Sequence, residues 1–301
     1  MRARNGGIAA LTAILVVAVA ATAAAMMLRQ QSAMLDQTLL VSSRAQADQY
    51  AAAGLDWARG VLTYDARTST TDSLREGWAQ PIVGLPIERA VVAGAIADEQ
   101  SKFNLNNLVA ARPSQADLKV FRQLLVILDV DPALADNATE WIDENASDAY
   151  YLALPRPYRS AKARKFATVD ELHRVRGFDA KIVARIRPYV TALPEEGHKT
   201  VNGNTASDVV LAALAGVERS RIADIVAERD AKPFDTKEAL VNRLQQSGFT
   251  VQLADVDVAS QWFSARVSVR QDDVQLGTEA LLKRAPGRDG AVQTIWRRPI
   301  Y

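Results

Sequence analysis

The longest apolar run of the chain, Ile8 to Leu28, contains no charged residue and only Thr12 and Thr22 interrupt its apolarity. A transmembrane helix needs about 20 apolar residues, and basic residues favour the cytoplasmic side of the membrane. Arg2 and Arg4 precede the run. The pattern therefore predicts one membrane-spanning helix, with most of the chain outside the cytoplasm.

The helical pattern continues after this run. From Arg29 to Leu62 the chain has no proline, and apolar residues recur at steps of three and four, at Leu35, Leu39, Leu55, Ala58 and Leu62. We expect one helix that ends after Tyr64. Its length of about 55 residues corresponds to about 80 Å, so half of it projects from the membrane.

Two kinds of processing fit the N-terminus. Gly7 precedes Ile8 at the cytoplasmic edge of the run, where a type IV prepilin peptidase would cut and leave the helix on the mature protein. The alternative is a secretory signal peptide, since the run also contains the small-residue site Ala21-Thr22-Ala23. The continuation of the helix beyond Leu28 favours the prepilin interpretation.

The middle of the chain begins with a polar segment. Asp65 to Gly84 is rich in Thr, Ser, Asp and Gly and predicts a linker. The β-branched residues of Ile87 to Ala97 predict one or two strands. Asp98 to Leu108 follows, with three asparagines that we interpret as capping and turn residues, namely Asn104, Asn106 and Asn107.

From Ser114 to about Asn242 the pattern predicts short helices. Ser114 to Leu128 begins with an N-cap serine and has one apolar face, and Pro132 to Trp141 forms a second helix. Asp170 to Val190 and Ser207 to Arg229 resemble each other, because each reads as helix, glycine turn, helix. This pattern is typical of helix-hairpin-helix or SAM-like units.

DNA-binding units of this kind hold a phosphate on a turn that reads glycine, hydrophobic, glycine. Here the third position is Asp179 in one unit and Glu218 in the other. A carboxylate about 4 Å from a phosphate costs roughly 1 kcal/mol in water, and more at a partly dry contact. Both units are therefore interpreted as packing units, and Arg219, Arg221 and Arg229 leave DNA binding open as the alternative.

The last segment predicts strands. Trp262 to Val269 alternates between apolar and polar residues, Gln271 to Asp273 forms a turn, and Val274 to Leu282 continues the alternation. Val292 to Trp296 adds a third strand. We expect an antiparallel sheet with one apolar face, which the exported half of the long helix covers.

Three carboxylates, Asp143, Glu144 and Asp148, gather in a short irregular segment. Oxygen ligands at irregular spacing suit calcium, but the spacing and the glycine of the EF-hand are absent. The segment is either a calcium site or a solvated acidic turn.

Composition excludes several classes of function. The chain has 301 residues, of which 49% are hydrophobic and 24% charged, and this supports two or three packed units. Its net charge of +1 provides no overall field for nucleic acid, and without cysteine it forms no disulfide. His173 and His198 lie far apart, and no catalytic motif is present. These features indicate a structural or interaction protein, not an enzyme.

Several motifs together resemble the minor pseudopilin K family of type II secretion, also called general secretion pathway protein K. They are Gly7 before IAALTAILVV, WARGVL around Trp57, DEQSKFNLNNL from Asp98, WIDENASDAYYLALPRPYRSAKA from Trp141, VDELHRVRGF from Val169 and VNGNTASDVVLAAL from Val201. The resemblance implies an α+β pseudopilin fold, a long N-terminal transmembrane helix packed on an antiparallel sheet, with a large inserted all-α domain that contains the two SAM-like units.

The resemblance also implies six segments. These are a leader at 1–7, the helix at 8–64, a linker with the first strands at 65–113, helical subdomains at 114–196 and 197–248, and the last strands at 249–301. It implies a single-pass protein of the bacterial inner membrane with a periplasmic C-terminal domain. Prepilin peptidase, the I and J pseudopilins and the secretion machinery would be its partners, and calcium its cofactor in some members.

Thr12 is the fifth residue counted from Ile8. Most pilin-like chains have a glutamate there, which pairs with the N-terminal amine of a neighbouring subunit inside the membrane. An unpaired charge at the bilayer centre costs at least ~2.5 kcal/mol, so a subunit without that neighbour should lack the carboxylate. Thr12 and the bulky insertion together predict a position at the tip of the pseudopilus. The alternative is that Thr12 is a tolerated polar residue in an apolar helix.

Overall fold

Helix α1 (Asn5–Thr68) is the longest element of the molecule. The computed structural model describes residues 5–109, 115–160, 164–194, 197–287 and 290–300. The 64 residues of α1 span about 96 Å. The helix ends four residues after the expected Tyr64, because Asp65 to Thr68 include no helix breaker and the Thr68 hydroxyl donates to the carbonyls of Tyr64 and Asp65.

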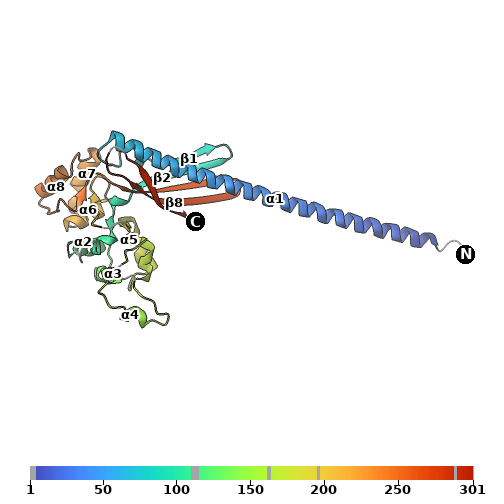
Figure 1. The fold of residues 1–301 in the computed structure, drawn as a ribbon, viewed down its shortest axis with the longest axis horizontal. Helices are drawn as coiled ribbons and strands as arrows, with labels where there is room; N and C mark the ends of the chain where they lie inside the picture. Colours follow the sequence, from blue (N-terminus) through green and yellow to red (C-terminus); the bar gives the residue numbers. More distant parts are fainter. Residues whose placement is uncertain (1–4, 110–114, 161–163, 195–196, 288–289, 301) are drawn as a thin grey trace.

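Only the second half of α1 packs against the rest of the described chain. Residues 10–42 are exposed, and Figure 1 shows this half as a free rod. In the second half one face is buried at steps of three and four residues, by Ala47, Ala51, Leu55, Ala58 and Leu62. This face lies on the sheet, as the pattern predicted for Leu55, Ala58 and Leu62, whereas Leu35 and Leu39 of the same pattern are exposed because they lie in the half of α1 that projects beyond the sheet.

The sheet has five antiparallel strands in the order β1-β2-β7-β8-β9. The strands are β1 (Ile82–Ile87), β2 (Ala90–Asp98), β7 (Trp262–Gln271), β8 (Val274–Arg284) and β9 (Val292–Ile300). Phe263, Ala265 and Val267 alternate on the face that packs against α1, and their polar neighbours face the other side. The predicted antiparallel sheet covered by the long helix is confirmed.

Strand β1 begins inside the segment Asp65 to Gly84, which the sequence predicted as a linker. It begins at Ile82, after a 3-10 turn at Gly77–Ala79, and it contains Pro86. Proline removes a backbone donor, and a strand at the edge of a sheet tolerates this because one side has no partner strand. The single proline and the short apolar run obscured the strand pattern.

Residues 99–261 form an insertion between β2 and β7, which are neighbours in the sheet. Its helices are α2 (Gln115–Ile127), α3 (Leu134–Ile142), α4 (Ala149–Leu152), α5 (Ala180–Ile186), α6 (Asp208–Ala215), α7 (Ala223–Ala231) and α8 (Lys237–Gln246), with 3-10 turns at Glu99–Ser101, Leu105–Val109, Val169–Arg174, Arg187–Tyr189 and Arg219–Ile222. The expected N-cap Ser114 lies outside the described residues.

The insertion is not all-α, and that expectation is corrected. Strand β3 (Phe103–Asn104) pairs in parallel with β4 (Val190–Thr191), and β5 (Val201–Asn202) pairs in parallel with β6 (Val256–Asp257). Strands of two residues produce no alternating pattern, so the sequence could not reveal them.

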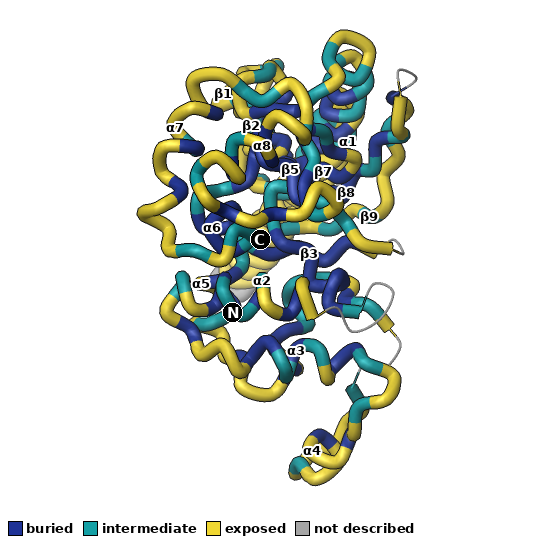
Figure 2. Tube along the Cα trace, turned by 90° about the vertical axis from the view of Figure 1, so that its left-hand side faces the viewer, coloured by how far each residue is buried: buried dark blue, intermediate teal, exposed yellow. Residues whose placement is uncertain are grey.

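One apolar core fills the insertion. Phe103 and Phe121 stack with ring centroids 5.5 Å apart, and the same cluster continues to Val210 and Leu240 in the second half of the insertion. Figure 2 shows this buried interior in dark blue, with α4 at the exposed end. The residues expected as two helical subdomains therefore share a core.

Each of the two hairpin-like units turns at a glycine in the left-handed region, Gly177 with φ 84° and Gly216 with φ 66°. However, the segment before Gly177, Val169–Arg174, is a 3-10 turn where an α-helix was expected. The segment after Gly216 also begins with a 3-10 turn, Arg219–Ile222. At the start of α5 the Asp179 carboxylate accepts the Ile182 N–H at 2.8 Å. This carboxylate takes the position that a phosphate would need.

Candidate functional site

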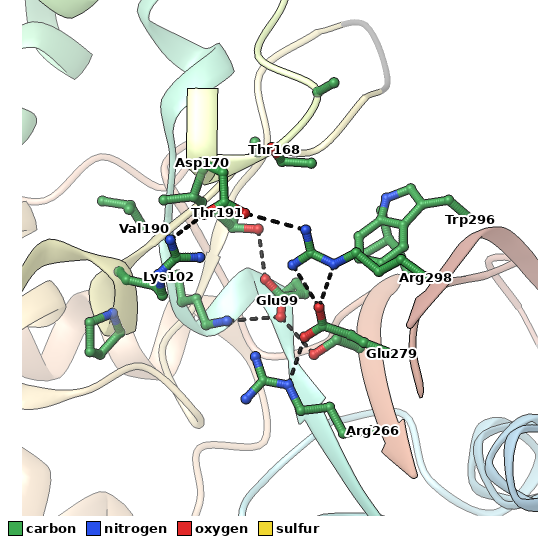
Figure 3. A pocket seen from close by; sticks show the side chains of 17 residues that line it. Glu99, Lys102, Thr168, Asp170, Val190, Thr191, Arg266, Glu279, Trp296 and Arg298 are labelled. Carbon is green, nitrogen blue, oxygen red and sulfur yellow. Dashed lines mark hydrogen bonds and ion pairs between the residues drawn. The ribbon is translucent and has the colours of Figure 1, made fainter. Parts of the chain in front are cut away.

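A cleft of 310 Å³ lies where the insertion meets the open face of the sheet. Its lining from the insertion includes Glu99, Lys102 and Asp170, and its lining from the sheet includes Glu279 and Arg298. Figure 3 shows these side chains pointing toward one another across the cleft. The cleft is therefore an internal junction between the two parts of the molecule.

A chain of alternating charges crosses this junction. Asp170 pairs with Arg187 of the insertion and, at 3.3 Å, with Arg298 of β9. Arg298 pairs with Glu279 of β8 at 2.7 Å, and Glu279 pairs with Arg266 of β7 at 2.6 Å. The hydrogen bond from Arg187 is the main cause that lowers the pKa of Asp170. Asp170 is thus held ionised as a structural partner of both arginines.

Glu99 is the buried carboxylate at the base of the cleft. It accepts hydrogen bonds from Lys102 at 2.8 Å, from the Thr191 hydroxyl at 2.7 Å and from the Ser264 hydroxyl at 2.7 Å. Burial alone would raise the pKa of Glu99, but Lys102 and the two hydroxyls outweigh it and the pKa is lowered. Glu99 thus joins the insertion, through Lys102 and Thr191, to β7, through Ser264.

Asp98, the last residue of β2, is a second buried carboxylate that accepts several hydrogen bonds, and we call this group the Asp98 hub. Its carboxylate accepts from the Gln100 N–H at 2.7 Å, from Asn202 at 3.0 Å, from Thr205 at 2.5 Å and from Ser260 at 2.6 Å. Burial raises the pKa of Asp98 to about 6. The hub lies where the chain enters the insertion at residue 99 and leaves it at residue 261.

A third carboxylate group lies at the end of α1. One carboxylate oxygen each from Asp65, Asp72 and Glu76 lies within 4.8 Å of the other two. Arg284, at the end of β8, pairs with Asp65 at 2.8 Å and with Asp72 at 2.5 Å.

The acidic segment singled out in the sequence has a different arrangement. Asp143 accepts from the Asn145 N–H at 3.0 Å, and Glu144 is exposed. Asp148 is buried and accepts from the backbone N–H of Ser160 at 3.0 Å and from the Ser160 hydroxyl. Among the described residues these three do not form a group with ligand atoms within 4.8 Å. Calcium binding by them stays a prediction.

The residues assigned to processing and assembly lie at the free end of α1. Gly7 and Ile8 belong to its first turns, and Thr12 is exposed further along. Among the described residues, α1 is the one helix long and apolar enough to cross a membrane, and its most apolar window has a mean hydropathy of 2.4.

The sequence pointed to the acidic segment and to α1, but it missed the cleft, the Asp98 hub and the group at Asp65. These sites join residues from segments that are up to 219 positions apart. The only local signal was the run of polar residues Asp98 to Ser101 directly after a strand.

These features define a class of protein. A long apolar N-terminal helix lies on an antiparallel sheet, a helical insertion separates two neighbouring strands, and the described polar clusters act as structural joints. This is the architecture of a pilin-like assembly subunit whose N-terminal helix is long and apolar enough to cross a membrane.

Comparison with known proteins identifies the family. Two family models, both described as type II secretion system (T2SS), protein K, match residues 101–195 and 201–261. The type II secretion system protein K of Pseudomonas aeruginosa is 31% identical over 99% of this chain and 93% of its own length. That of Aeromonas hydrophila is 29% identical over 98% and 97%. The chain belongs to the type II secretion system protein K family, and it is a minor pseudopilin.

A solved structure shows the same fold. The crystal structure of the GspK-GspI-GspJ complex from the enterotoxigenic Escherichia coli type 2 secretion system contains a chain that matches with a TM-score of 0.77 at 23% identity. The match covers 88% of this chain and 99% of that one. The family is a structural component of secretion, and the DNA-binding alternative has no support.

Proposed function

We propose that this chain is anchored in the inner membrane by residues 8–28, projects into the periplasm and caps the pseudopilus with I and J minor pseudopilins, where it supports protein secretion across the outer membrane. The observation that carries the tip position is the place of the insertion, which lies at the end of the molecule away from the N-terminus (Figure 1). A subunit stacked on that end would overlap the insertion. The role is structural and involves no catalysis or nucleic acid.

Copy number tests the tip position. Quantitative labelling of pseudopili assembled in a native host should give one copy per filament, and many copies along the filament would contradict the proposal. The variant Thr12→Glu shows whether the tip position depends on the missing carboxylate at Thr12 or on the bulk of the insertion. A count that stays at one assigns the position to the insertion, and a higher count shows that Thr12 contributes.

The mature N-terminus tests processing. Prepilin peptidase should cut between Gly7 and Ile8, so mass spectrometry of protein from a native host should find Ile8 as the first residue. A mature chain that starts after Ala23 would instead indicate a signal peptidase and would remove the membrane anchor.

The exposed side of α1 supports contact with other pseudopilins. At 100° per residue, five large side chains lie within about 20° of one line along the helix. They are Leu28, Leu35, Leu39, Trp57 and Tyr64, and they are 44–69% exposed. This line is about 140° away from the face that α1 buries on its own sheet. We call these five residues the outer stripe.

An apolar groove continues the outer stripe beside the sheet. It has a volume of 210 Å³ and lies between α1 and strands β1 and β2, with Gly54, Trp57, Leu85 and Val92 in its lining. Apolar stripes on membrane-anchored helices bury well against parallel helices of the same kind. Such helices are what I and J pseudopilins anchored in the same membrane would supply.

Two adjacent leucines give a matched test of this surface. Leu39 lies on the outer stripe, whereas Leu40 lies 120° around the helix from Leu28, the first residue of the stripe. The two leucines are similarly exposed, at 62% and 53%. Leu39→Glu should reduce copurification of the full chain with I and J pseudopilins at least about tenfold, because a charge is then buried at the contact. Leu40→Glu should reduce it much less. Equal loss in both variants would exclude the outer stripe as the specific contact.

A further inference from the structure

The carboxylate group at the end of α1 collects negative charge from three segments. Asp65 belongs to the last turn of α1, Asp72 to the loop that follows, and Glu76 precedes the 3-10 turn at Gly77. Among the described residues, this is the one group of three or more acidic, histidine or cysteine side chains whose ligand atoms lie within 4.8 Å of one another.

The positive charge beside this group is smaller than the negative charge. Arg284 binds the Oδ2 atom of Asp65 at 2.8 Å and the Oδ2 atom of Asp72 at 2.5 Å. Glu76 instead accepts from neutral donors, the Ser73 N–H at 3.1 Å and the Trp78 indole at 2.6 Å. Three carboxylates therefore share one guanidinium in an environment that is mostly buried.

Asp72 provides an independent sign of a missing partner. Its side chain is fully buried, and the backbone N–H of Ser260 and the Arg284 guanidinium both bind its Oδ2 atom. Its Oδ1 atom has no hydrogen-bond partner among the described residues. A buried carboxylate oxygen without a partner is unfavourable, and it requires a proton, a donor or a cation.

We propose that Asp65, Asp72 and Glu76 bind a divalent cation, and that calcium is the ion that fits. Calcium binds oxygen ligands at 2.3–2.6 Å, so oxygens on opposite sides of it lie about 4.6–5.2 Å apart. The three ligand oxygens lie within 4.8 Å of one another, close enough to bind one ion of this size. Magnesium is less suited, because it demands near-ideal octahedral geometry and usually keeps several of its waters. Zinc is less suited because the group offers no nitrogen or sulfur ligand.

Arg284 and the cation do not need the same oxygens. The guanidinium takes the Oδ2 atom of each aspartate and leaves the Oδ1 side of Asp72 for the ion. A cavity of 260 Å³ adjoins the group and is lined by Ser69, Ser260 and Arg284. Calcium takes six to eight oxygen ligands, so waters would have to complete its coordination beside the three carboxylates.

The ion would join several elements at one end of the helix–sheet interface. The group contains the end of α1, the loop at 69–76 and, through Arg284, the end of β8. Through Ser260 it also reaches the point where the insertion returns to the sheet. Calcium should therefore stabilise the attachment of both α1 and the insertion to the sheet, and its saturation should raise Tm by roughly 5 °C.

Terbium luminescence offers a local readout, because Trp78 donates to Glu76 and lies beside the site. In the full chain in detergent at neutral pH, Tb³⁺ should give emission sensitised by Trp78, and Ca²⁺ should displace Tb³⁺ more effectively than Mg²⁺. Trp78→Phe should remove most of this emission. Trp141, which precedes the acidic segment, is the comparison, and Trp141→Phe should preserve the emission.

Matched variants separate this site from the acidic segment. Glu76→Gln should weaken Ca²⁺ binding at least about tenfold while the Tm in EDTA stays nearly the same, because the amide oxygen still accepts hydrogen bonds. Asp143→Asn should leave the affinity unchanged. If Glu76→Gln does not fold, Asp65→Asn serves as the second variant. Absence of binding up to about 1 mM Ca²⁺, or binding lost only in Asp143→Asn, overturns the proposal.

Discussion

Asn106 shows how one polar side chain can hold together distant parts of the insertion. Its amide donates to the carbonyls of Phe166 at 3.0 Å and Leu193 at 2.8 Å, and its oxygen accepts the Phe166 N–H at 2.7 Å. The sequence suggested a turn residue. Its partners lie 60 and 87 positions away, so no local pattern could identify them.

Replacing this side chain should be costly. Asn106→Ala leaves three buried backbone groups without partners, and each unpaired group costs about 1–3 kcal/mol, so we expect a loss of about 3 kcal/mol or more in the free energy of unfolding. Chemical denaturation measures it. Asn145→Ala, at an exposed position, is the control and should change stability by less than about 0.5 kcal/mol. Similar values for both would contradict the structural role of Asn106.

His198 should make the insertion sensitive to pH. Its ring lies 3.1 Å from Asp117 and 3.9 Å from Asp255, and the hydrogen bond with Asp117 is the main cause that raises the pKa of His198 above 6.5. Burial of the ring, and to a smaller extent the charge of Lys199, oppose this rise in the pKa. A raised histidine pKa stabilises the fold fully below about 6.5, and this contribution is lost as pH rises through the folded-state value.

The stability of His198→Gln should therefore differ from that of the unmodified chain more at pH 6 than at pH 9. Thermal unfolding at both pH values measures this difference. His173→Gln, at an exposed position, should show no such dependence. If His198→Gln lowers the thermal stability by the same amount at pH 6 and at pH 9, the ion pair of His198 makes no contribution.

Two glycines of α1 differ in what surrounds them. At Gly54 a Cβ atom would lie 2.8 Å from the Cγ1 atom of Val267 in the sheet, whereas at Gly60 nothing lies within 4 Å. Gly54 thus permits the close approach of helix and sheet. Gly60 has no such role in the described contacts.

The same substitution should therefore have opposite effects at the two positions. Gly60→Ala should stabilise by about 0.5–1 kcal/mol, because alanine favours the helix. Gly54→Ala should destabilise by about 1–3 kcal/mol, because the added methyl group moves α1 away from β7. Denaturation of both variants gives the comparison, and stabilisation by Gly54→Ala would show that the interface can adjust.

Regular elements were the predictable part of this fold. α1, β7 and β8 were visible in the sequence because their apolar residues repeat with the period of a helix or a strand over many residues. β1 and the two-residue strands were not, since Pro86 or their short length removes the period. The joints around Glu99, Asp98 and Arg284 could not be predicted, because their chemistry depends on tertiary contacts.

The charged chain across the cleft gives a prediction for the whole molecule. Glu279 is 5% exposed and pairs with both Arg266 and Arg298, which are more exposed. Glu279→Gln should destabilise by about 2 kcal/mol, less than a fully buried pair because solvent screens the arginines. Hydrogen exchange should increase where the insertion meets β8 and β9. Asp136→Asn, which breaks an exposed pair with Arg122, is the control and should have little effect.

The position of the insertion also has a consequence for the rate of folding. Asp98 of β2 pairs with Phe263 of β7, so neighbouring strands are separated by 165 positions along the chain. Closing so long a loop is slow, because its entropy must be lost before the strands gain contacts. The folded insertion brings its own ends together, as the hydrogen bond from the Gln261 N–H to Gln100 shows. The insertion should therefore fold first, and the sheet should close only afterwards.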